Sequence, residues 1–122
     1  MIVILIGLIA FASSSLRGAA GDVNAQRSAR RALLAQKSLY ADAGEYGDAA
    51  AVKQAEPSLP TTDRPPQVMG EVFVRSDGAT TTLASADDDG NCYWIRDDGI
   101  TTRYAKAPCG QEPPVTEFKR SW

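Results

Sequence analysis

The sequence predicts an α+β fold, in which a long N-terminal helix with a hydrophobic first half and an amphipathic second half packs on a three- to four-stranded antiparallel sheet. Three observations predict it. Residues 1–16 carry no charge and run into a polar segment that contains no proline. After residue 67 the hydrophobic pattern changes to the period of two that is typical of strands. Asp-Gly pairs separate the later runs, as in antiparallel hairpins.

The apolar run at residues 1–16 has three interpretations. A helix that crosses the hydrocarbon core of a bilayer needs about 20 apolar residues, so the run is slightly short for one. A secretory signal fits the length, and Ala10-Phe11-Ala12 resembles a small-x-small cleavage site, but such signals begin with a basic region. A buried core helix is the third interpretation. The pattern favours the spanning helix, and the other two stay open.

Residues 22–40 are predicted to be helical because Ala, Leu, Gln, Arg and Lys dominate and no Gly or Pro interrupts them. Gly44 is a natural end for this helix, since glycine readily adopts the left-handed conformation of a C-terminal cap. Apolar residues at helical spacing form one stripe that we expect to face the sheet. The predicted helix-to-sheet core contains Val23, Ala29, Leu33, Tyr40, Phe73 and Trp94.

The rest of the chain divides by composition. Four prolines end a connecting region with little periodicity. Strands are predicted at residues 68–74, 79–86, 92–96 and 100–105, and an extended tail follows. The predicted segments are therefore the hydrophobic helix at 1–16, the amphipathic half at 17–43, the connecting loop at 44–66, the sheet with its disulfide loop at 67–108, and the C-terminal tail at 109–122.

Composition argues against catalysis and against nucleic-acid binding. The 122 residues include no histidine, so acid–base chemistry would fall to carboxylates. The densest group, Asp87-Asp88-Asp89, is typical of a solvated turn and lacks the ligand spacing of a calcium loop. Residues 1–40 carry five basic and one acidic side chains, net +4, whereas residues 41–122 carry eight and fourteen, net −6. We expect no enzyme, metal, cofactor or nucleic-acid partner.

Cys92 and Cys109 are the only cysteines, and both lie in turn-rich, strand-like sequence. That placement is typical of a local disulfide in an exported protein. The alternative is a zinc site, but two thiolates without histidine do not supply the usual four ligands. The disulfide is the favoured prediction.

Three segments, in order along nearly the whole chain, resemble type IV pilins. Residues 2–12 are similar to the hydrophobic segment of pilins. Residues 32–46, ALLAQKSLYADAGEY, are similar to the A-x-x-x-Y-x-x-x-x-G-x-Y end of the pilin helix. Cys92-Tyr93-Trp94 and Cys109 stand where the family places its disulfide-bounded loop. The family's early glutamate is not in this sequence, and Ser13-Ser14-Ser15 takes the place of its usual proline.

The resemblance implies a structural subunit of a type IV pilus filament. It implies a single-pass membrane location with the domain outside, an extracellular filament, and as partners further copies of the chain, other pilins, the assembly machinery and the membrane. The alternatives are a pseudopilin of a type II secretion system and a secreted binding module with a cleaved signal. The residues expected to form the membrane and filament-core helix are Ile2, Val3, Ile4, Leu5, Ile6, Leu8, Ile9 and Phe11.

Overall fold

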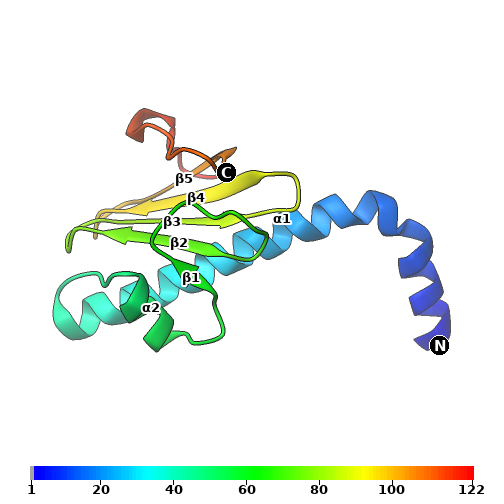
Figure 1. The fold of residues 1–122 in the computed structure, drawn as a ribbon, viewed down its shortest axis with the longest axis horizontal. Coiled ribbons are helices and arrows are strands. Elements are labelled where there is room, and N and C mark those ends of the chain that lie inside the picture. The colour runs from blue at the N-terminus through cyan, green and yellow to red at the C-terminus, as the bar shows by residue number, and fades with distance from the viewer. Residues whose placement is uncertain (1) are drawn as a thin grey trace.

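The computed structural model describes the backbone of residues 2–122 and the side chains of residues 23–122. Two α-helices precede and flank a small sheet, and a 3₁₀ turn lies in the tail (Figure 1). The elements are α1 (Ile2–Ala43), α2 (Ala49–Ala55), β1 (Thr61–Thr62), β2 (Val72–Ser76), β3 (Thr81–Ala86), β4 (Asn91–Asp97), β5 (Thr102–Pro108) and η1 (Val115–Glu117).

The sheet follows the order of the chain, β1-β2-β3-β4-β5, with β1 parallel to β2 and the other neighbours antiparallel. The predicted fold class is therefore wrong. The sheet is five-stranded and mixed, a second helix lies beside it, and the helix whose described side chains contact the sheet is the short stretch of residues 23–43 rather than a long apolar helix. Strand β1 was not predicted because it has only two residues, within a proline-rich segment.

The described part of α1 packs on the sheet through a row of small residues. Ala25, Ala29, Ala32, Leu33 and Gln36 are buried, at the three- and four-residue spacings of one helix face. Alanines leave little side chain between the helix and the strands, so the backbones approach closely. The helix ends as predicted by its glycine: Gly44 has a φ of 76°, and its amide donates to the Tyr40 carbonyl at 2.8 Å.

Aspartates build the hairpin turns that join the antiparallel strands. The Asp77 side chain accepts hydrogen bonds from the Ala79 and Thr80 amides, and the Asp98 side chain does the same for the two amides that follow Gly99. The glycine of each turn has a positive φ. These acidic residues are therefore turn-forming groups in the structure.

Both faces of the sheet are covered. On the helix side, α1 and α2 pack on apolar residues that include Val72, Val74, Leu83 and Ile95. On the opposite side, the C-terminal tail packs on Phe73, Ala84, Trp94 and Ala105 through Phe118 and the disulfide. The protein therefore has three layers, with the red tail of Figure 1 forming the third.

The tail also closes one edge of the sheet. Tyr104 of β5 and Lys119 exchange both backbone hydrogen bonds, each at 2.7 Å. Beyond Lys119 the chain brings Trp122 against the rings of Tyr93 and Tyr104, with centroids 5.4 and 4.8 Å away. The last residues thus pack against β4 and β5 and form hydrogen bonds with the outer strand, β5.

No helix among the described residues is long and apolar enough to cross a membrane. This finding overturns the predicted single-pass membrane location. The residues predicted to form the membrane and filament-core helix, Ile2 to Phe11, lie outside the range whose side chains the structure describes.

Candidate functional site

The two cysteines are joined. Cys92 of β4 and Cys109, just after β5, form a disulfide with a Cα–Cα distance of 4.9 Å and a sequence separation of 17. Both are buried beneath the tail, and the Cys109 amide donates to the Gly90 carbonyl at 3.2 Å. A loop of this size contributes about 3 kcal/mol in the chain-entropy description.

The predicted helix-to-sheet core is divided between two places. Ala29 and Leu33 lie between α1 and the sheet. Phe73 and Trp94 are buried, with ring centroids 5.9 Å apart, but they face the tail. Their strand neighbours face the helix instead, since successive strand residues point to opposite faces.

The other two predicted core residues are largely outside that core. Val23 is 50% exposed and Tyr40 is 38% exposed. Tyr40 lies beside Tyr46, with ring centroids 4.7 Å apart. Val23 points to the opposite side of the helix from the buried alanine row, whereas Tyr40 lies on the same side as that row but near the helix end, beside Tyr46.

A buried polar cluster that the sequence did not reveal fixes the loop after α1. The Tyr46 hydroxyl donates to Asp97 Oδ1 at 2.5 Å, and the Thr102 hydroxyl donates to Oδ2 at 2.6 Å. Burial raises the pKa of Asp97, but the hydrogen bonds from Thr102, Tyr46 and the Gly99 amide outweigh burial and hold that pKa below its usual value. Burial, followed by the Asp97 bond and charge, raises the pKa of Tyr46.

Gln36 joins the same loop to the sheet. Its side-chain nitrogen donates to the Gly47 carbonyl and to Thr81 Oγ1, and its oxygen accepts from the Gly47 amide, all at 2.8 Å. The side chain is fully buried. Both polar clusters are satisfied internally, so they support the scaffold rather than present reactive groups.

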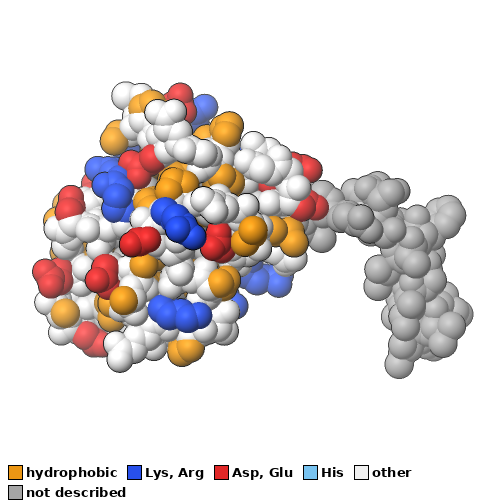
Figure 2. All heavy atoms as spheres, viewed as in Figure 1, with side chains coloured by type: hydrophobic (Ala, Val, Ile, Leu, Met, Phe, Trp, Pro, Cys, Tyr) orange, Lys and Arg blue, Asp and Glu red, His pale blue; other side chains and the backbone are white. Residues whose placement is uncertain are grey.

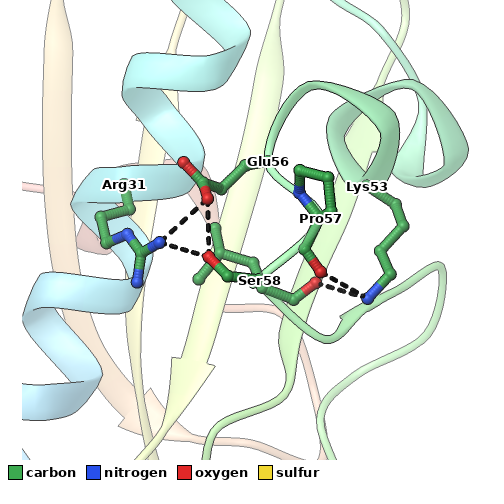
Figure 3. Close-up of polar contacts among 6 residues, drawn as sticks. Arg31, Lys53, Glu56, Pro57 and Ser58 are labelled. Atoms are coloured by element: carbon green, nitrogen blue, oxygen red, sulfur yellow. Dashed lines mark hydrogen bonds and ion pairs between the residues drawn. The ribbon is translucent and has the colours of Figure 1, made fainter.

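Arg31 attaches α1 to the segment after α2, as Figure 3 shows. Its guanidinium donates to Glu56 Oε1 at 2.9 Å and to the Ser58 hydroxyl, which in turn donates to Glu56 at 2.6 Å. The Ser58 bond, helped by the Arg31 charge, lowers the pKa of Glu56. Lys53 donates to the Pro57 and Leu59 carbonyls, each at 3.1 Å. Arg31 and Lys53 therefore both have hydrogen-bond partners within the fold.

Two further bases of α1 also have internal partners. The Arg30 guanidinium lies 5.0 Å from the centre of the Trp122 ring, and Lys37 Nζ lies 3.7 Å from Asp97 Oδ2. Arg27 is exposed and has no ion pair or side-chain hydrogen bond within residues 23–122. Of the four bases in residues 23–43, Arg27 is the one without a partner among the described side chains.

Arg27 lies on an exposed surface that we term the outer helix face, formed by Val23, Arg27 and Leu34. At 3.6 residues per turn, these residues point away from the buried alanine row. Leu34 is 67% exposed and Val23 50% exposed. The outer helix face therefore combines a positive charge that has no partner within residues 23–122 with two exposed apolar side chains.

A second surface surrounds Met69, in the loop before β2. A hollow of about 320 Å³ is lined by Val68, Met69, Asp87, Asp88 and Cys109, among others. A smaller one of about 160 Å³ is lined by Asn24, Ser28, Met69 and Ser85. Because Met69 borders both, we treat them together as the Met69 site. Val68 and Met69 are 61% and 60% exposed.

Two buried polar atoms belong to residues of the Met69 site and have no hydrogen-bond partner within residues 23–122. Asp87 is 4% exposed and Ser85 is fully buried. Asp87 Oδ1 accepts from the Asp89 and Asn91 amides at 2.8 and 3.0 Å, whereas Oδ2 and the Ser85 hydroxyl have no hydrogen bond. Buried groups of this kind are normally satisfied, so this site has unmet hydrogen-bonding capacity.

Within residues 23–122, no group of three or more His, Cys, Asp or Glu is placed to hold a metal ion. No local pattern in the sequence indicates the Met69 site, because it joins a loop, a helix and a hairpin turn that are far apart along the chain. No protein-family model, curated protein or solved structure matches this chain. The Met69 site thus combines buried oxygen atoms that can accept hydrogen bonds with exposed apolar side chains.

Proposed function

We propose that this protein is a structural subunit of a filament of the type IV pilus kind, that it acts by assembly rather than by catalysis, and that it polymerises through its N-terminal helix. The observation that carries the proposal is the outer helix face. The sheet and α2 cover one side of α1, and Val23, Arg27 and Leu34 are left uncovered. The resemblance of residues 2–12 and 32–46 to pilins supports the same function.

The exposed surface supports assembly through several small contacts. Figure 2 shows acidic, basic and hydrophobic side chains interspersed over the face in view. Burial of apolar area contributes about 25 cal/mol per Å², and complementary charges fix the register between neighbours. Contacts between two different patches that do not close on themselves generate a filament. The disulfide is typical of a protein that works in an oxidising compartment.

Assembly of the purified full chain tests the proposal. Electron microscopy and sedimentation at rising protein concentration should show filaments. Leu34→Asp should reduce the yield of filaments by about tenfold or more. The substitution places a charge in a contact where burial of the leucine side chain contributes about 1.5–3 kcal/mol.

Val115→Asp is the matched control, since Val115 is 57% exposed and lies on η1 in the tail. It should assemble normally. A full chain that remains monomeric at every concentration would overturn the proposal. Mass spectrometry of the mature protein separates the alternatives: a methylated hydrophobic start supports a pilin, and a start near Ser13 supports a secreted binding module.

A further inference from the structure

We propose that the Met69 site binds a basic side chain of a second copy of this chain, and that this side chain is Arg27 of the outer helix face. The inference rests on the proposed filament function, because it names one contact between neighbouring subunits. It starts from the two unpartnered polar atoms and the exposed apolar residues around them.

The acidic half of the contact is Asp87 with Asp88. Both line the larger hollow, and no lysine or arginine of residues 23–122 lines it. Asp87 Oδ2 is buried without a hydrogen bond. A buried polar group without a partner is destabilising, and more so when it is charged. A cationic donor supplied from outside would satisfy this oxygen and neutralise the local charge.

Apolar residues line the same hollow as the acidic group. Val68 and Met69 are mostly exposed, and the unbranched methionine side chain adapts readily to a partner. Met69 and Asp87 line the same hollow, so movement of the Met69 side chain changes the space beside Asp87. The complementary ligand is therefore a basic group carried on a long apolar stem and flanked by hydrophobic residues.

The outer helix face has this composition. Arg27 is unpaired within the described side chains and points away from the sheet, and its guanidinium can bond a carboxylate with two parallel N–H groups. Leu34 follows at a distance of about 10 Å along the helix axis, and Val23 precedes by about 6 Å. One copy therefore offers a base between apolar residues, and the next offers an acid beside apolar residues.

The two surfaces are different patches of one molecule. When the outer helix face of one copy occupies the Met69 site of another, each copy retains one unused patch. Such a heterologous contact continues from subunit to subunit. The sequence is basic in the helix and acidic in the later residues. In the proposed contact, Arg27 and Asp87 are the pair through which these opposite charges meet.

Charge exchange in the full chain tests the contact. Arg27→Glu alone and Asp88→Arg alone should each weaken association by about tenfold or more, the range expected for close charge pairs. The double variant should recover part of the association, because the exchanged charges at positions 27 and 88 attract each other while Asp87 stays acidic. An equimolar mixture of the two single variants should also recover it, since both of its alternating contacts pair opposite charges. Sedimentation velocity measures association, and circular dichroism checks the fold.

Asp63→Arg is the matched control, because it makes the same charge change at an exposed residue beyond β1 and outside the Met69 site. It should leave association unchanged. If the wild-type chain forms filaments but neither single variant weakens them, or the double variant does not recover, this contact is wrong and the filament function stands. A wild-type chain that does not associate refutes the filament function itself. Association that stops at a closed dimer refutes the propagating contact.

Discussion

Tyr46→Phe is the most direct test of the polar cluster that joins the loop after α1 to the β4–β5 turn. The substitution removes one hydroxyl and keeps the ring that lies beside Tyr40. Asp97 is 2% exposed and accepts the Tyr46 hydrogen bond at 2.5 Å. Hydrogen bonds to charged groups contribute about 1.5–3 kcal/mol, so the free energy of unfolding at pH 7 should fall by about that amount.

The effect should depend on pH with a defined sign. Burial raises the pKa of Asp97, and the hydrogen bonds from Thr102, Tyr46 and Gly99 lower it further than burial raises it, to below its ordinary value of 3.8. A carboxylate whose folded-state pKa is lowered contributes stability that is complete above the unfolded-state pKa and is lost as the pH falls through the folded-state pKa. Removing the Tyr46 bond raises the folded-state pKa of Asp97 toward its unfolded-state value, so the variant should lose less stability on acidification and its loss should end at a higher pH. The difference from wild type should therefore narrow below about pH 4.

Urea unfolding of the full chain, followed by circular dichroism between pH 3 and pH 8, measures both effects. Tyr104→Phe is the matched control, because its hydroxyl has no hydrogen-bond partner among residues 23–122 and its ring contact with Trp122 is retained. The control should change stability by less than about 0.5 kcal/mol. Equal stability of the Tyr46 variant and the control across this pH range would refute the reasoning.

Three other substitutions test the remaining supports of the fold. Replacing both Cys92 and Cys109 by serine should lower the free energy of unfolding by about 3 kcal/mol, read from the urea midpoint, and an unchanged midpoint would contradict this. Gln36→Met should cost about 1–3 kcal/mol, because it leaves the Gly47 amide without its acceptor, and hydrogen exchange at that amide should accelerate. Trp122→Ala should cost about 1–3 kcal/mol through the loss of two aromatic contacts and a cation–π contact, measured as a lower melting temperature.

Local signals in the sequence were sufficient where one residue type determines the backbone. The helix end at Gly44 and the Asp-Gly turns follow from glycine's access to positive φ. The pairing of Cys92 with Cys109 was also predictable, since the chain has no other cysteine. The helix end and the turns depend on the backbone preference of single residues, and the disulfide depends on there being one possible pair of cysteines.

The faces of the strands were not predictable. Every residue of β3 is buried, and the first three residues of β2 are buried, because helices cover one side and the tail covers the other. Alternation therefore cannot say whether Val72 or Phe73 faces the helix. Residues 68–70 were expected in a strand but form a turn, with Gly70 at a φ of 94°. The Met69 site and the distinction between Arg27 and Arg31 depend on tertiary contacts that no local pattern encodes.

The cross-link between β4 and the end of β5 also determines how the protein responds to a pulling force. The 17-residue separation closed by the disulfide has a contour length of about 55 Å when fully extended, against the 4.9 Å that separates its ends in the fold. Under tension the oxidised domain cannot release this length. Reduction should therefore lengthen the unfolding step in a single-molecule experiment by about 50 Å. The oxidation state of one bond would thus set the extensibility of the domain.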